Sequence, residues 1–222
     1  MRVRYLGHAA FLLDDGGSAV VLDPYRDISD SPAPDRRWDY PVIAGVDADL
    51  VLISHDHGDH NHPEAIGGDP LLIRSRAGRF KTPLGEVVGV NSDHDAEAGS
   101  LRGANTIFVF TLGGVRVCHL GDLGQRALRD EQVEAIGPVD LLLAGVGGGS
   151  ASSPQETASI VERIGARWVL PMHYRTPYVD FMEPVDTFLG LVGHVHPIAA
   201  SEFDTSELPD GDGQTFVVPA VP

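Results

Sequence analysis

Residues 50–60 read Leu-Val-Leu-Ile-Ser-His-Asp-His-Gly-Asp-His, so four apolar residues lead directly into a cluster of histidines and aspartates. Leu50–Ile53 is apolar at every position, which is typical of a strand buried on both faces. The sequence therefore predicts that the polar cluster lies at the end of a buried strand.

This cluster has the pattern H-x-H-x-D-H, which combines the side chains that most often bind metal ions. Residues i and i+2 of an extended segment project to one side, so His55 and His57 can hold one ion. A turn at Gly58 can direct Asp59 and His60 toward a second ion. The alternative is a solvated polar loop, but such groups packed closely without a cation would be poorly satisfied or would repel one another. We therefore expect a metal site here.

The composition is that of a folded protein and excludes several classes of function. The chain has 222 residues, 42% of them hydrophobic, and its apolar runs fall far short of the roughly 20 residues that cross a bilayer. The formal net charge of −16 opposes binding to nucleic acids and anionic membranes at long range. The single cysteine, Cys118, cannot form an intramolecular disulfide, and the start of the chain lacks the apolar stretch of a secretory signal.

These features predict one domain over residues 1–222, located in the cytoplasm, with a small-molecule substrate. No nucleic-acid partner and no membrane insertion are expected. The sequence leaves open whether the chain forms a homo-oligomer.

Hydrophobic patterns and turn residues predict strands first, and then strands mixed with helices. Besides residues 50–53, strands are expected at residues 3–6, 10–13, 18–22, 71–74, 87–90, 106–111, 115–119, 141–144, 168–170 and 214–218. Helices are expected at residues 126–136 and 154–164, the second with Ser153 as its N-cap and Gly165 at its exit. This order indicates an α/β protein built as a layered sandwich. Residues 25–49 form a long irregular segment that could cover a site.

Several segments together resemble one family of enzymes. They are Ser54–His60, Leu6–Phe11, Leu22–Pro24, Arg102–Phe108, His119–Gly124 and Pro171–Thr176. They resemble the metallo-β-lactamase superfamily of metal-dependent hydrolases, and within it the branch that includes L-ascorbate-6-phosphate lactonase-like proteins and N-acylphosphatidylethanolamine-hydrolysing phospholipase D. The resemblance covers about residues 3–176. It implies a four-layer αββα sandwich with a dinuclear metal site along one edge.

The resemblance also implies a set of metal ligands. The first metal would be held by His55, His57 and His94, the second by Asp59, His60 and His173, and Asp122 would bridge both. From the sequence alone, Asp122 is equally well a capping residue. His94 by itself would be interpreted as an ordinary loop histidine, and His173 is equally well a hydrogen-bonded structural histidine. Only the whole set favours a metal site.

The ligand set predicts the chemistry. Seven nitrogen and oxygen donors without a thiolate suit Zn²⁺, and Mn²⁺, Fe²⁺ or Ni²⁺ as alternatives. Two such ions can share a water and supply hydroxide, which would attack an ester, lactone or phosphoester of a small molecule. Asp59 is expected to orient this water as well, and Asp23 to hydrogen-bond the ligand loop. The alternatives are a phosphodiesterase acting on lipid or nucleotide substrates, and a non-catalytic metal-binding sensor or scaffold.

Five further residues are weaker candidates. His8 could face the substrate or donate a proton, or could be a buried turn histidine. Arg102 and Asn105 are candidates for shaping the site or binding an anionic group, although a structural role is the simpler interpretation. Tyr174 and Arg175, beside His173, are candidates for substrate contact, although surface exposure would explain them equally well.

Overall fold

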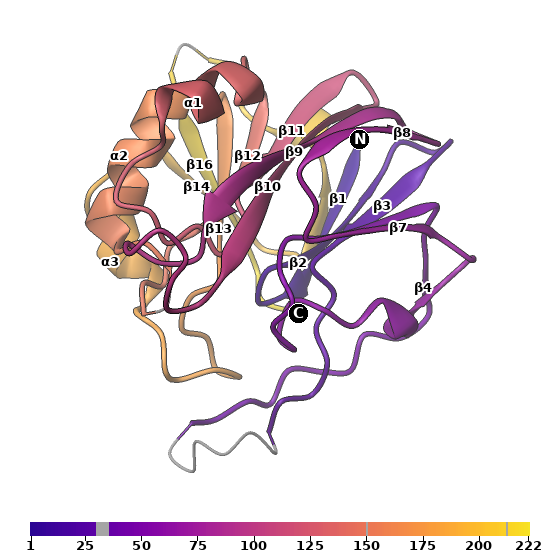
Figure 1. The fold of residues 1–222 in the computed structure, drawn as a ribbon, viewed down its shortest axis with the longest axis horizontal. Coiled ribbons are helices and arrows are strands. Elements are labelled where there is room, and N and C mark those ends of the chain that lie inside the picture. The colour runs from indigo at the N-terminus through magenta and orange to yellow at the C-terminus, as the bar shows by residue number, and fades with distance from the viewer. Residues whose placement is uncertain (30–35, 150, 212) are drawn as a thin grey trace.

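Two β-sheets packed face to face form the centre of the molecule (Figure 1). The structure is a computed structural model that describes residues 1–29, 36–149, 151–211 and 213–222. Figure 1 shows the first sheet, mainly in indigo and violet, on the right and the later strands of the second sheet, in orange and yellow, on the left.

The first sheet has six strands in the order β15-β1-β2-β3-β5-β7. Their bounds are β1 Arg2–Gly7, β2 Ala10–Asp14, β3 Ala19–Leu22, β5 Leu50–Ile53, β7 Leu71–Arg74 and β15 Glu202–Asp204. The chain runs antiparallel from β1 to β3, whereas β3, β5 and β7 are parallel. The residues after β3 and β5 therefore lie at the same edge of the sheet.

The second sheet has eight strands in the order β14-β16-β13-β12-β11-β10-β9-β8. Their bounds are β8 Gly78–Thr82, β9 Gly85–Asp93, β10 Ala104–Leu112, β11 Val115–His119, β12 Leu141–Gly145, β13 Trp168–Met172, β14 Val195–Ile198 and β16 Thr215–Pro219. Strands β11, β12, β13 and β16 are parallel neighbours. Every strand predicted from the sequence is present, and the structure adds short strands that the patterns did not predict.

Apolar side chains from both sheets fill the space between them. Fully buried examples are Phe11 on β2, Phe108 on β10 and Leu170 on β13. Burying a side chain of this size stabilises the fold by about 1.5–3 kcal/mol. This core holds the two sheets together and sets the distance between the loops at their edges.

Three α-helices cover the outer face of the second sheet, and each contributes buried side chains to the core there. Their bounds are α1 Asp130–Ile136, α2 Pro154–Ile164 and α3 Val185–Leu189. The bounds of α2 are those predicted. The prediction for α1 was wrong at its start, because the helix begins at Asp130 and residues 126–129 precede it as loop and cap.

The outer face of the first sheet is covered differently. The irregular segment that follows β3 packs there through Tyr25, Trp38, Tyr40 and Ile43. A two-stranded sheet, β4 Val46–Asp47 with β6 Ile66–Gly67, and the 3-10 helix Pro63–Ala65 complete this layer, and a second 3-10 helix spans Thr205–Glu207. The predicted fold class, a mixed α/β sandwich with two central sheets, is confirmed.

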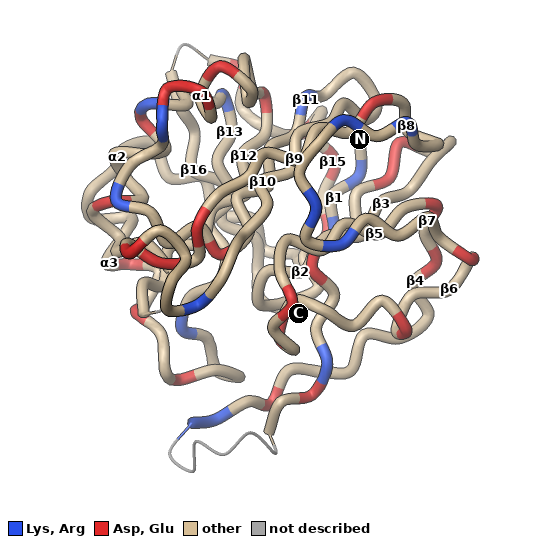
Figure 2. The backbone as a smooth tube through the Cα atoms, in the orientation of Figure 1, with Lys and Arg blue, Asp and Glu red and all other residues tan. Residues whose placement is uncertain are grey.

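Acidic residues lie on helices and loops in many parts of the molecule (Figure 2), as the net charge of −16 implies. None of the helices in the described residues is long and apolar enough to cross a membrane.

Candidate metal centre

The loop that carries the H-x-H-x-D-H pattern is fixed at its first residue. Asp23, fully buried at the end of β3, accepts hydrogen bonds from the backbone amide and the hydroxyl of Ser54, both at 2.7 Å. Because β3 and β5 are parallel neighbours, Asp23 lies beside the residue at which β5 ends. As expected from the sequence, Asp23 thus holds the loop in place.

A first group of possible ligands contains His55, His57 and His94, whose ligand atoms lie within 4.8 Å of one another. The Nδ1 atom of His57 and the Nε2 atom of His94 are 3.1 Å apart. Two nitrogens bound to one tetrahedral zinc ion at their usual distance are about 3.3 Å apart. The spacing therefore fits two ligands of one ion.

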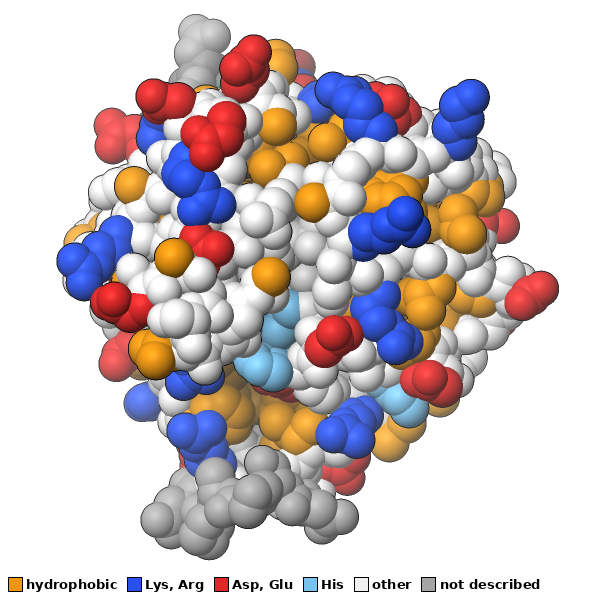
Figure 3. Space-filling model, in the orientation of Figure 1, with side chains coloured by type: hydrophobic (Ala, Val, Ile, Leu, Met, Phe, Trp, Pro, Cys, Tyr) orange, Lys and Arg blue, Asp and Glu red, His pale blue; other side chains and the backbone are white. Residues whose placement is uncertain are grey.

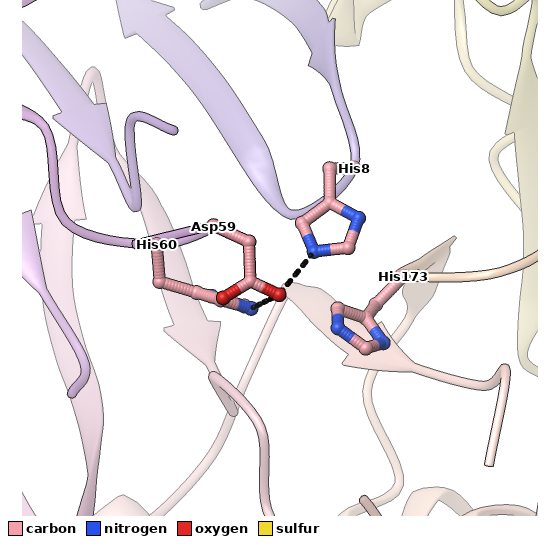
Figure 4. Close-up of side chains that lie close together, drawn as sticks. All are labelled: His8, Asp59, His60 and His173. Atoms are coloured by element: carbon pink, nitrogen blue, oxygen red, sulfur yellow. Dashed lines mark hydrogen bonds and ion pairs between the residues drawn. The ribbon is translucent and has the colours of Figure 1, made fainter. Parts of the chain in front are cut away.

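A second group contains Asp59, His60 and His173, together with His8, again within 4.8 Å of one another. Figure 4 shows the rings of His8, His60 and His173 around the carboxylate of Asp59, with interactions drawn from His8 and His60. The Nε2 atom of His60 lies 4.0 Å from an oxygen of Asp59. This group corresponds to the predicted second metal site, with His8 added to it.

Asp122 lies between the two groups. One oxygen of Asp122 is 3.3 Å from Nε2 of His60. The other oxygen is 3.3 Å from Nε2 of His173, 3.6 Å from Nε2 of His94 and 4.0 Å from Nε2 of His55. The carboxylate therefore approaches possible ligands of both groups, as a bridging residue must.

The backbone around Asp122 is arranged to hold it there. Its amide donates to the side-chain oxygen of Asn105 at 3.1 Å. Gly121 has a φ of +58°, and a Cβ atom at this position would lie 2.4 Å from the same Asn105 oxygen. Glycine is needed here because it adopts positive φ without strain and leaves room for this contact.

The chemistry of these groups fits divalent cations. Within the described residues, the buried atoms of the centre without a hydrogen-bond partner include these four: Nε2 of His55, His60 and His173 and one oxygen of Asp122. A buried polar atom without a partner costs about 1–3 kcal/mol. Cations bound here would satisfy all four.

Burial also sets the charge states. It lowers the pKa of His55 to about 2 and that of His94 to about 4, so both imidazoles are neutral near pH 7 and keep a lone pair for a metal. Burial alone would raise the pKa of Asp122, but the neighbouring His173 and His60 outweigh it and hold that pKa well below its usual range. Burial opposes protonation of His60, but Asp122 and Asp23 outweigh it and hold the pKa of His60 well above its usual range. The centre thus offers neutral imidazoles at His55 and His94 and an ionised carboxylate at Asp122, whereas His60 must give up a proton when it binds a metal.

His8 lies behind Asp59. Its Nε2 atom is 3.3 Å from an oxygen of Asp59, and its ring contacts Trp38 edge-on with centroids 4.8 Å apart. Burial and the nearby His173 lower the pKa of His8 to about 4. His8 is fully buried and contacts Asp59, and it does not belong to the described lining of the cavity over the centre.

A cavity of about 480 Å³ opens over the centre. Its described lining is Ile28, Arg36, His57, Asp59, Arg102, Asp122, Gly148, Gly149, His173, Phe181 and Met182. Figure 3 shows histidine side chains in pale blue in a hollow of the surface, with hydrophobic side chains next to them and basic side chains at the rim.

Of the four residues expected to contact substrate, the structure brings only Arg102 to this cavity. Asn105 is fully buried, and its amide nitrogen donates to Leu120 and Ser92 while its oxygen accepts from Asp122. Tyr174 is buried in the core under the helices, and the guanidinium of Arg175 donates to the carbonyl of Met182 at 2.7 Å. None of these three residues belongs to the described lining of the cavity.

Two residues near the site were not predicted to belong to it. His119 donates from Nε2 to the same oxygen of Asp23 that His60 contacts, at 2.8 Å. Cys118 and His119 are neighbours on one strand, so their side chains point to opposite faces of the sheet. This is a signal that His119 faces the other sheet. Arg36 lines the cavity, but it lies within residues 25–49, where the sequence pattern gives no signal of its position.

Comparison with known proteins identifies the family of the chain. A family model described as a β-lactamase superfamily domain matches residues 2–173. The chain is 29% identical over 225 residues to a UPF0173 metal-dependent hydrolase of Thermococcus kodakarensis, covering 87% of this chain and 92% of the relative. It is 31% identical over 198 residues to a UPF0173 protein of Pyrococcus furiosus, covering 79% and 84%.

A solved structure agrees over nearly the whole chain. A crystal structure from Thermotoga maritima, described provisionally as a zinc-dependent hydrolase of the metallo-β-lactamase superfamily, superposes with a TM-score of 0.78. It shares 32% sequence identity and covers 98% of this chain and 97% of its own. The chain therefore belongs to the UPF0173 family of metal-dependent hydrolases within the metallo-β-lactamase superfamily.

Proposed function

We propose that the chain is a hydrolase that uses two divalent cations, held in its two ligand groups, to cleave an ester, lactone or phosphoester of a small molecule. His55, His57 and His94 would hold one cation, Asp59, His60 and His173 the other, and Asp122 both. One observation carries this proposal, namely that the Asp122 carboxylate lies within 4.0 Å of nitrogen ligands in both groups.

Two cations in these positions would lower the pKa of a shared water toward about 7 and polarise the oxygen of the bond to be cleaved. Nitrogen and oxygen donors without sulfur suit Zn²⁺ first, and Mn²⁺, Fe²⁺ or Ni²⁺ as alternatives. The described cavity lining holds no serine, threonine or cysteine, so it supplies no side chain of these types as a nucleophile. In this proposal the nucleophile is therefore the shared water.

Asp59 is the residue placed to orient that water. Its carboxylate lines the cavity, and its side chain is 21% exposed. Burial would raise the pKa of Asp59, but His60 and His8 hold it below its usual range, so the carboxylate is ionised and can accept a proton or a hydrogen bond. His8 contacts this carboxylate from the buried side and keeps its orientation.

The size of the cavity favours a small molecule, since ligand pockets of about 300–1,000 Å³ hold substrates of that kind and this cavity is about 480 Å³. The motifs shared with the branch of ascorbate-6-phosphate lactonase-like proteins and phospholipase D favour a lactone or a phosphoester among the three bond types. A phosphodiesterase acting on lipid or nucleotide substrates is the second candidate, supported by the same motifs.

Turnover of a panel of esters, lactones, phosphomonoesters and phosphodiesters tests this proposal, with the protein loaded in turn with each of the four metals. We expect turnover that falls at least a hundredfold in His57→Ala while the circular dichroism spectrum is retained. His62→Ala is the matched control, because His62 lies just beyond the motif and contacts Glu64 instead of the centre. Unchanged turnover in His57→Ala, or bound metal without turnover on any substrate of the panel, would contradict the proposal and favour a sensor or scaffold.

A further inference from the structure

Apart from the metal ligands, the cavity is lined by two kinds of side chain. Arg36 and Arg102 are basic, and Ile28, Phe181 and Met182 are apolar. The described lining contains no carboxylate other than those of Asp59 and Asp122, although the chain has twice as many acidic as basic residues. Apart from the metal ligands, the charged side chains of the cavity wall are therefore basic, whereas the chain as a whole has a net negative charge.

The position of Arg102 is fixed by the backbone around it. The carboxylate of Asp95 accepts hydrogen bonds from the amides of Glu97, Gly99, Leu101 and Arg102, at 2.8–3.0 Å. The next residue, Gly103, accepts a hydrogen bond from the amide of His94 at 3.1 Å. Arg102 is therefore held next to the first ligand group.

Arg36 lies near the second ligand group. Its guanidinium stacks over the ring of Phe181, 5.0 Å from the centroid. The next residue, Arg37, donates its amide to Asp180 at 2.9 Å, so the backbone of this segment is fixed beside Phe181. The chain beyond Phe181 is tied to the residues after His173, because the amide of Arg175 donates to the carbonyl of Glu183 at 2.9 Å.

Arg36 and Arg102 therefore line the cavity from the sides of different ligand groups. Guanidinium binds carboxylate and phosphate oxygens through paired, charge-assisted hydrogen bonds. A protein with a net charge of −16 repels anions at long range, so an anionic substrate needs local cations in order to bind. Three apolar side chains in the same wall favour a substrate that is only partly charged.

We propose that the substrate carries an anionic group, a carboxylate or a phosphate, in addition to the bond that is cleaved, and that this group is bound by Arg36 and Arg102. The apolar part of the substrate packs against Ile28, Phe181 and Met182. This inference rests on the proposed function, since it takes the cavity over the metal centre as the substrate site. Arg36 and Arg102 are specificity-determining residues in this account.

Binding of small ligands, measured by titration calorimetry on the metal-loaded protein, tests the inference without turnover. Benzoate and phenylphosphonate combine an anion with an apolar ring, and acetophenone is the neutral counterpart without a hydrolysable bond. We expect at least one of the two anions to bind tenfold or more tightly than acetophenone. We also expect Arg102→Gln and Arg36→Gln each to weaken binding of that anion by about tenfold or more while changing the affinity for acetophenone less than twofold.

Arg74→Gln is the matched control, because Arg74 is an exposed arginine on β7 outside the described lining of this cavity. It should leave the affinity for all three ligands unchanged. Equal binding of the anions and acetophenone, no measurable binding of either anion, or anion binding that is unchanged in both arginine variants would overturn the inference. The last result would mean that the anion contacts the metals alone. Loss of turnover in His57→Ala tests the proposed function separately, so the two can fail independently.

Discussion

The Nδ1 atom of His60 donates a hydrogen bond to Asp23 over 2.9 Å, and this contact decides which nitrogen of His60 is left for a metal. With Nδ1 carrying the proton, Nε2 keeps its lone pair and faces Asp122 at 3.3 Å. The same oxygen of Asp23 accepts from His119 at 2.8 Å. Asp23 thus links the first sheet, the ligand loop and the second sheet through one buried carboxylate.

Replacing Asp23 with asparagine should weaken metal binding about 10–100-fold, as loss of a partner behind a ligating histidine typically does. Asparagine tolerates the positive φ of +40° at this position, so the backbone can be retained. Competition with a chelator of known affinity measures the effect. Asp27→Asn, in an exposed turn, is the control and should bind metal as the wild type does. Wild-type affinity in Asp23→Asn would show that this contact does not prepare His60.

Removing the metals should lower the melting temperature, because buried atoms of His55, His60, His173 and Asp122 then lose their partners. Metal at a hundred times its dissociation constant stabilises a folded protein by about 2.7 kcal/mol per site. Thermal unfolding with and without a chelator, followed by addition of Zn²⁺ or Mn²⁺, measures this. A melting temperature that is indifferent to both treatments would count against a cation site among these residues.

Gly124→Ala should destabilise the protein by about 1–3 kcal/mol, the usual cost of overpacking. A Cβ atom at this position would lie 2.4 Å from the backbone of both His94 and Asp95, which cannot move without displacing a ligand. Gly193→Ala is the control, since nothing lies within 4 Å of its added Cβ. Denaturant unfolding compares the two variants. Equal free energies of unfolding for the two variants would mean that the backbone at His94 shifts at little cost to make room for the added Cβ atom.

Cys118 should be unreactive in the folded protein. Burial raises the pKa of its thiol to about 12, and the side chain is fully buried between β10 and β12. Iodoacetamide at pH 8 should therefore leave the native chain unmodified and alkylate it in denaturant, which mass spectrometry resolves because the chain has one cysteine. Rapid alkylation without denaturant would show that this part of the core opens.

Local signals account for the elements that could be predicted from the sequence. Helix α2 has its predicted bounds because Ser153 and Glu156 cap it with reciprocal hydrogen bonds between neighbours in sequence. Helix α1 begins at Asp130, later than predicted, because Arg129 is its N-cap. The side-chain oxygen of Gln132 accepts a hydrogen bond from the backbone amide of Arg129 there. The loop before it is held by Ser152, which donates to the carbonyl of Gln125 from 27 residues away. A local pattern does not reveal such a contact.

The same distinction applies to the site. The ligands between His55 and His60 come from one loop, so their spacing alone predicted a metal centre. His94, Asp122 and His173 follow three different strands, and the strand order brings them together, which periodicity does not show. Arg36 reaches the cavity through contacts of an irregular segment with residues near 180, for which the sequence has no pattern.

The most direct test of the two-metal account is a crystal structure of the metal-loaded protein with anomalous difference maps recorded at the absorption edge of the metal. The account predicts two peaks about 3.5–4 Å apart, one beside His55, His57 and His94 and the other beside Asp59, His60 and His173, with Asp122 touching both. A single peak, or peaks outside these two groups of ligands, would contradict it.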